Sequence, residues 1–191
     1  MNLNDANNYT KKLFSVKWVK WIHEGLKPAE TAAEKQKNVI LGIITGHCAK
    51  CRNLNGCCFV EDKCPEFIPH WHCHCELRAI NSVNVKAKSI VDKFSRYVFV
   101  TKNGKNDLFT SWGYDIMDSQ YLSDEFATQA KLAYSAGDYA LGRLDEYGQR
   151  ISIEITLISP DNGKKVTFLS GWMVYPDGKI LLTTPYGGKQ K

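Results

Sequence analysis

No cysteine precedes Cys48 and none follows Cys75, so all seven cysteines of this 191-residue chain lie within residues 47–75, together with four of the five histidines. The sequence also lacks a run of 18 apolar residues, so we expect no membrane-spanning helix. The first residues, MNLNDANNYTKK, lack the apolar segment of a secretory signal. The expected location is therefore the cytoplasm. A protein delivered into a target cell as the tail of a larger carrier, or carried in a phage particle, would lack a signal too.

The sequence has no strongly basic half. Residues 1–85 carry 11 Lys and Arg against 8 Asp and Glu, residues 86–191 carry 14 against 12, and the net charge is +5. Neither balance by itself indicates a nucleic-acid-binding protein. Hydrophobic residues make up 43% and charged residues 24% of the chain, as in soluble globular proteins. The length suits one domain, or one domain with a small added module.

The cysteine and histidine residues favour a metal site. An odd number of cysteines leaves one over after disulfide pairing, and disulfides are rare in a reducing compartment. Zinc accepts thiolate sulfur and imidazole nitrogen in tetrahedral sets of four. Cys48 and Cys51 form a C-x-x-C pair, and a compact second group follows at His70, Cys73 and Cys75. We therefore expect a structural zinc ion held by the pair and by two members of the second group.

The same stretch contains more candidates than one ion needs. Three further cysteines, Cys57, Cys58 and Cys64, are either spare buried thiols or ligands of a second ion. The remaining histidines of the stretch are expected to be surface residues. No acidic residue is placed to act as a general base, which disfavours a catalytic metal. Disulfides or free thiols remain the alternative. The remaining histidines are His47, His72 and His74.

The spacing in this stretch resembles the C-terminal motif of phage Mu F-type minor head proteins, which combine C-x-x-C-x-x-L-x-G with a later H-P-x-C-x-C. The matching segments are CAKCRNLNGCCF at residues 48–59 and PEFIPHWHCHC at residues 65–75. Trp71 stands where the family has proline, and His74 where arginine is common. The resemblance covers about 30 residues and implies a metal knuckle. It does not imply a capsid protein, because the large helical body of that family has no room in this chain.

Apolar periodicity predicts two N-terminal helices. Phe14, Trp18, Ile22 and Leu26 recur every four positions and predict a helix over residues 8–26. Pro28 ends this pattern and is suited to open a second helix. Residues 81–89, NSVNVKAKS, are polar and small and read as a linker. The expected organisation is a helical segment at 1–46, a zinc knuckle at 47–80, this linker, and a separate domain at 90–188.

The C-terminal domain is expected to be α+β. Residues 96–102 read as a strand, and a helix begins near Asp118 and ends near Gly137. A meander of strands follows, in which Ile151, Ile153 and Ile155 alternate with polar residues, as one buried sheet face requires. Asn-Gly and Asp-Gly pairs supply the turns. We therefore expect one helix packed on an antiparallel sheet of four or five strands, and we expect this domain to fold without the cysteine segment.

Residues 93–188 resemble an uncharacterised domain family found at the C-termini of bacterial polymorphic toxins and in phage minor-head fusions. That family is similar to the Barnase–EndoU–colicin–RelE group of ribonucleases, some of which lack a catalytic histidine. The resemblance implies a phosphate site in which Lys, Arg, Tyr and Thr stabilise charge and move a proton. The site residues that it implies are Lys105, Asp145, Tyr147, Arg150, Thr184 and Tyr186, and other matching positions are Phe109, Gly113, Gly148 and Trp172.

Two functions from different classes follow. The first is a phage- or mobile-element-derived protein with a structural zinc knuckle and a toxin-type domain that acts as a metal-independent ribonuclease on RNA. The second is a non-enzymatic phage or prophage structural or adaptor protein whose sheet binds another protein. An immunity or regulatory protein is a third alternative. In a purely structural interpretation, Arg150 has no functional role and only forms an ion pair with Asp145 or Glu146 across its hairpin.

Overall fold

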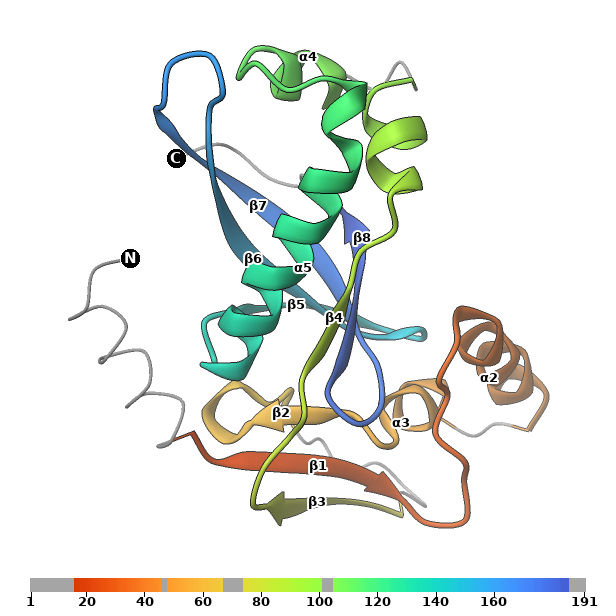
Figure 1. Ribbon diagram of the computed structural model, residues 1–191. Helices are drawn as coiled ribbons and strands as arrows, with labels where there is room; N and C mark the ends of the chain where they lie inside the picture. Colours follow the sequence, from red (N-terminus) through yellow and green to blue (C-terminus); the bar gives the residue numbers. More distant parts are fainter. Residues whose placement is uncertain (1–15, 46–47, 67–73, 101–104, 186–191) are drawn as a thin grey trace.

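The chain forms two sheets with helices around them, as the computed structural model shows for residues 16–45, 48–66, 74–100 and 105–185 (Figure 1). A five-stranded sheet has the order β4-β8-β7-β6-β5, and a three-stranded sheet has the order β2-β1-β3. One long helix, α5, crosses the larger sheet, while α2 and α3 lie beside the smaller one. The α+β class expected from the sequence is confirmed.

The antiparallel part of the larger sheet follows the apolar alternation of the sequence. β6 (Gly148–Ile158) pairs with β5 (Ala140–Asp145) on one side and with β7 (Lys165–Val174) on the other, and β8 (Lys179–Thr184) pairs with β7. The isoleucines of β6 at positions 151, 153 and 155 are at most 1% exposed. They face α5 (Ser119–Ser135), whose Leu122, Phe126, Ala130 and Tyr134 are fully buried at helical spacing.

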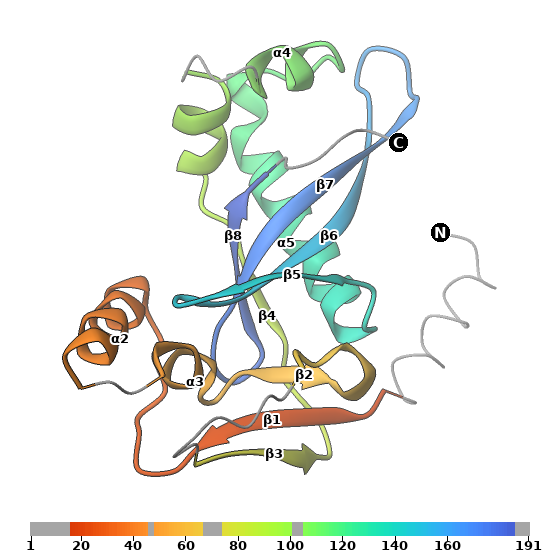
Figure 2. The same ribbon diagram turned by 180° about the vertical axis from the view of Figure 1, so that it is seen from behind.

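Aromatic rings fill the space between α5 and the sheet. The ring of Phe109, in α4 (Lys105–Thr110), stacks on Phe168 of β7 with centroids 4.7 Å apart. Phe94 and Phe126 pack edge to face at 5.1 Å. Helix α4 therefore lies on the same side of the sheet as α5. Figure 2 shows the opposite face of β6 and β7, which no helix of the described residues covers.

The expected linker at residues 81–89 is not a linker. Its residues Lys86–Lys88 form β4, which pairs in parallel with β8 at the edge of the larger sheet, and Val85 is 3% exposed. The sheet is thus antiparallel except at this one pair. The segment looked like a linker because a short edge strand with lysines on its outer face has little apolar pattern of its own.

The prediction of a helix at residues 8–26 is wrong for residues 16–26, the part of this range that the structure describes. Trp18–His23 form β1, the central strand of the smaller sheet, between β2 (Cys58–Val60) and β3 (Cys75–Ile80). Trp, Val and Ile are strand-forming residues, and pairing on both sides outweighs the four-residue spacing. Residues 8–15 lie outside the described residues. The second expected helix is present as α2 (Ala32–Thr45), after Pro28.

The strand expected at residues 96–102 is a helical turn where it is described. Lys93–Val98 form the π-helical segment η2, which buries Phe94 and Val98 one turn apart. The strand prediction failed because the buried residues Phe94 and Val98 lie four positions apart on one side of a helical turn, while Tyr97 and Val100 are exposed. Three short segments complete the fold: α3 (Ala49–Leu54) and the 3-10 turns η1 (Glu61–Lys63) and η3 (Ile116–Asp118).

The hydrophobic core is continuous across the expected domain boundary. One cluster of buried side chains includes Trp18 and Phe59 from the smaller sheet. The same cluster includes Phe126 and Tyr134 of α5 and Trp172 of β7, which belong to the larger unit formed by the five-stranded sheet and its helices. The rings of Trp18 and Tyr134 meet edge to face with centroids 5.7 Å apart. The segment before residue 90 therefore packs against the domain that was expected to stand alone.

Candidate functional site

Three of the expected metal ligands are brought together by α3 and β3. Cys48 is the residue before the first turn of α3, and Cys51 lies one turn later on the same short helix. Cys75 begins β3, where it pairs with His23 of β1. The C-x-x-C spacing thus places two sulfurs on one side of a helical turn, and the antiparallel pairing of β3 with β1 brings the third from a distant part of the sequence.

The three thiols interact directly. Burial and hydrogen bonds with the thiols of Cys75 and Cys48 raise the pKa of Cys51 above its ordinary value, with the Cys75 hydrogen bond as the largest cause. None of the six described cysteines is in a disulfide with another of them. His70 and Cys73 lie outside the described residues, and within the described part no group of three His, Cys, Asp or Glu side chains is set out to hold a metal ion. The donor set nevertheless fits zinc, which prefers thiolates, so zinc binding remains a prediction.

Of the other described cysteines, Cys57 and Cys58 are buried in the core and Cys64 is partly buried against it. The Cys57 sulfur lies 3.7 and 3.8 Å from the carbonyl oxygens of Asn53 and Val174, so its one S–H donates to this pair of acceptors, and burial raises its pKa to about 12. Burial also raises the pKa of Cys64 to about 12 and that of Cys58 above its usual value. Among the two interpretations left open for these residues, the geometry favours spare buried thiols. Of the expected surface histidines, His74 is exposed, and His47 and His72 lie outside the described residues.

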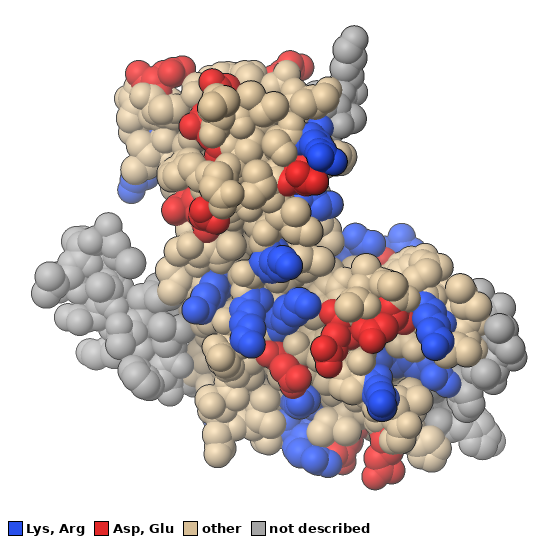
Figure 3. Space-filling model, turned by 45° about the vertical axis from the view of Figure 1, so that its right-hand side comes forward, with Lys and Arg blue, Asp and Glu red and all other residues tan. Residues whose placement is uncertain are grey.

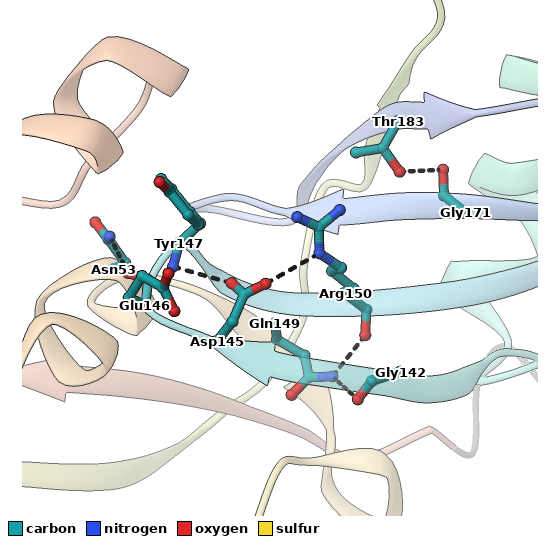
Figure 4. Close-up of polar contacts among 9 residues, drawn as sticks. All are labelled: Asn53, Gly142, Asp145, Glu146, Tyr147, Gln149, Arg150, Gly171 and Thr183. Atoms are coloured by element: carbon teal, nitrogen blue, oxygen red, sulfur yellow. Dashed lines mark hydrogen bonds and ion pairs between the residues drawn. The ribbon is translucent and has the colours of Figure 1, made fainter. Parts of the chain in front are cut away.

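A second polar group lies at the hairpin that joins β5 to β6 (Figure 4). The Asp145 carboxylate accepts from the backbone N–H of Tyr147 at 3.0 Å and from Nε of Arg150 at 3.2 Å. The Asp145 side chain is 7% exposed, whereas that of Arg150 is 44% exposed. Because Nε is used by Asp145, the two Nη nitrogens point away from the pair, and they have no hydrogen-bond partner among the described residues.

The remaining expected site residues are not all gathered there. Thr184 pairs with Gly171 in the β7–β8 ladder, and Arg150 pairs with Met173 two positions away on β7. Lys105 begins α4, which packs on the α5 side of the sheet, whereas Arg150 extends from the other face. The side chain of Lys105 and all of Tyr186 lie outside the described residues. The structure therefore joins Asp145, Tyr147 and Arg150 and separates the helix of Lys105 from them.

Basic residues share the face that carries Arg150. Across the sheet, Lys88 pairs with Leu181, Leu181 with Met173, and Met173 with Arg150, so these four residues form one row on one face. Lys86 pairs with Lys179 in the next row. Lys86, Lys88 and Arg150 are exposed. In the view of Figure 3, which labels no single residue, Lys and Arg side chains gather near the middle of the molecule with Asp and Glu side chains beside them.

Two residues that the sequence analysis missed hold the hairpin against α2 and α3. Lys35 of α2 is 2% exposed and donates from Nζ to the backbone carbonyl of Asn53 at 2.8 Å, with Nζ 4.8 Å from the Tyr175 ring centroid. Burial lowers the pKa of Lys35. Asn53 itself is 1% exposed. A lysine in a polar helical run reads as a surface residue, so the sequence carries no signal for its burial.

No protein-family model, curated protein sequence or solved structure matches this chain. The two resemblances therefore depend only on the residues quoted for them. Among the described helices, none combines the length and apolar character needed to cross a membrane.

Proposed function

We propose that this chain is a zinc-stabilised binding protein of the phage or mobile-element adaptor type, and that the open face of its larger sheet binds an anionic ligand through Arg150. The observation that supports this proposal most is the orientation of the guanidinium group. Asp145 accepts from Nε and fixes the side chain, while both Nη nitrogens remain directed away from the pair. Two parallel N–H groups of this kind suit a phosphate or a carboxylate.

The ligand class that we propose is single-stranded RNA. Lys88 and Arg150 end a row that crosses four neighbouring strands, so about 14 Å separates their backbones at the usual strand spacing. One phosphate cannot span that distance, but consecutive phosphates of a nucleic acid strand can. Lys86 and Lys179 extend the basic surface on the same face. An acidic peptide is the alternative ligand, and the experiment below distinguishes the two.

The ribonuclease is the second candidate, and one observation favours it. Tyr147 and Arg150 project to the same side of the hairpin (Figure 4), so a proton-transfer group and a charge-stabilising group would face one ligand. Against it stands the position of α4, which keeps the backbone of Lys105 on the opposite side of the sheet. For this reason we propose binding as the function and cleavage as an additional activity to be tested.

The role proposed for zinc is structural. The ligands would be Cys48, Cys51, Cys75 and one of His70 and Cys73. A bound ion would join α3 to β3. It would hold the three clustered cysteines as thiolates and offset their negative charge. The cavity beside Cys48 and Cys51, about 460 Å³ in volume, is lined on its other side by Leu144 and Glu146 of the β5–β6 hairpin.

The test is fluorescence anisotropy with a labelled single-stranded RNA of mixed sequence. We expect wild-type protein to bind with an affinity that falls as salt rises, and Arg150→Ala to weaken binding by about tenfold or more. Arg78→Ala, in β3, removes the same charge from an exposed position away from the sheet face and should bind like wild type. Melting temperatures of the three proteins establish that each is folded.

The same samples decide between the candidates. Intact RNA after incubation at neutral pH supports the binding protein, and cleavage that both Arg150→Ala and Tyr147→Phe abolish supports the ribonuclease. Displacement of RNA by polyglutamate, with tighter binding of the peptide than of RNA, moves the proposal to an acidic protein partner. Lack of binding to either polymer would overturn the proposed function.

A further inference from the structure

The thiol cluster and the Arg150 hairpin are joined by one buried residue. Asn53 lies two positions after Cys51 on α3. Its Nδ2 donates to the carbonyl of Glu146 at 2.6 Å, in the turn of the β5–β6 hairpin, and to the carbonyl of Lys35 at 3.0 Å. Its Oδ1 accepts from Nδ2 of Asn38 at 2.8 Å. Both donor hydrogens of the side chain are used, so its position is fixed from three sides.

The hairpin turn packs closely against the same two residues of α2 and α3. Gly148 has φ +115°, and a Cβ atom there would lie 2.9 Å from Nζ of Lys35 and 3.3 Å from the carbonyl oxygen of Asn53. Lys35 Nζ in turn donates to that same carbonyl. The backbone at Glu146 and Gly148 thus contacts Asn53 and Lys35 directly. A shift of α3 would therefore move the turn that holds Asp145 and Tyr147.

A cavity beside the thiols is lined by residues of both the thiol cluster and the hairpin. It is lined by Cys48, directly before α3, and Cys51 on α3, and by Leu144 and Glu146 on the hairpin. Leu144 and Glu146 flank Asp145, the residue that orients Arg150. Any change in how closely Cys48 and Cys51 approach Cys75 alters the wall that these hairpin residues share with α3.

We infer that the state of the Cys48, Cys51 and Cys75 centre controls the order of the β5–β6 hairpin, with Asn53 as the positioning residue, and thereby regulates ligand binding at Arg150. This inference rests on the proposed function for its ligand, but the coupling itself is a property of the folded chain. When the three sulfurs are held together, α3 is fixed and the hairpin is ordered. When they are released, the Asn53 contact to Glu146 loosens and Arg150 loses its fixed orientation.

The experiment is hydrogen exchange on the full chain, with and without zinc. Zinc content is measured first by elemental analysis, and the metal is then removed with a chelator under reducing conditions. We expect exchange in residues 142–150, above all at the Tyr147 amide that Asp145 accepts from, to become about tenfold faster on removal. Exchange in β7 beyond the hairpin should change less. Cys75→Ser, which leaves α3 intact in sequence, should reproduce the effect, and Cys64→Ser should not.

Asn53 is tested by Asn53→Asp, which keeps the acceptor and removes both donors. In this variant we expect fast exchange at residues 142–150 both with and without zinc, at unchanged zinc content. If that variant fails to fold, the zinc-dependent exchange of wild type and of Cys75→Ser still decides. Equal hairpin exchange in the zinc-loaded and metal-free proteins overturns the inference while leaving the proposed function standing. A protein that binds no zinc overturns both the zinc proposal and this inference, and a failure of RNA and polyglutamate binding alone overturns only the ligand.

Discussion

The Tyr134 hydroxyl, near the end of α5, donates a hydrogen bond to the backbone carbonyl of Cys58 in β2. Tyr134 is fully buried, and its ring also meets Trp18. Two residues from the smaller sheet therefore complete the surroundings of a residue on the long helix of the larger unit. Nearby, the Tyr139 hydroxyl accepts from the amide of Val60 at 3.2 Å.

These contacts change the expectation for a truncated chain. A fragment of residues 90–188 lacks Trp18, Cys58 and the strand β4, so the Tyr134 hydroxyl and the outer edge of β8 meet solvent. We expect this fragment to be less stable than the full chain, because exposing buried aromatic residues costs about 2 kcal/mol or more for each one. Urea unfolding followed by circular dichroism measures this. A fragment of residues 81–188, which restores β4 alone, shows how much each contact contributes, and equal midpoints for 90–188 and the full chain would contradict the prediction.

Gly148→Ala should destabilise the protein by about 2 kcal/mol or more, because φ +115° is strained for any side chain and the added Cβ approaches Lys35 and Asn53. Gly163→Ala is the matched control. Gly163 also has positive φ, at +68°, but a Cβ there meets no atom within 4 Å, so only the backbone cost of about 1 kcal/mol remains. Equal losses for the two variants in thermal or urea unfolding would mean that the hairpin does not rest on Lys35 as described.

Protein purified without chelator should contain about one zinc ion per chain. Binding free energies of about 10 kcal/mol or more are reached in zinc-finger peptides, so metal removal should lower the melting temperature clearly. Cys48→Ser or Cys51→Ser should lose the metal. Cys57→Ser should retain it, since the Cys57 thiol lies against two backbone carbonyls within the core instead. Metal-free protein with an unchanged melting temperature would refute the zinc centre.

The buried Lys35 should make stability depend on pH below 10.5. Burial lowers its pKa from the ordinary value of 10.5, so between the lowered value and 10.5 the unfolded chain binds more protons than the folded chain. Stability must then rise with pH across that window. Lys35→Met keeps most of the buried length and removes the charge. The difference in unfolding free energy between wild type and this variant should shift in favour of wild type as pH increases from 7 to 10. A constant difference would show that the pKa of Lys35 is not lowered.

The sequence predicted the elements in which the spacing of apolar residues directly reflects which side of the element is buried. The isoleucines of β6 alternate because one face is buried, and the stripe of α5 repeats because one side meets the sheet. Both patterns are local, so they could be read directly. β1 has no such pattern: Trp18 and Trp21 are buried because β2 and β3 pair on either side, and pairing with distant segments leaves no periodic mark.

The candidate site divides in the same way. The C-x-x-C spacing predicted that Cys48 and Cys51 lie close together, and the Asp145–Arg150 ion pair was the purely structural alternative for its hairpin. Asn53 and Lys35 could not be identified, because their role depends on α3 and the hairpin meeting in space. The separation of Lys105 from Arg150 was equally hidden, since it follows from the side of the sheet on which α4 packs.

The parallel pairing of β4 with β8 has a consequence for how the chain folds. β4 lies between the smaller sheet and all the remaining elements in sequence, yet its one strand partner among the described residues is β8, close to the end of the chain. Closing so long a loop is entropically costly and slow. During synthesis the cysteine segment emerges well before β8, so its thiols meet the surrounding solution while the sheet edge is still open. The β4–β8 pairing should therefore be the last step of folding, completed only when residues 179–184 have emerged from the ribosome.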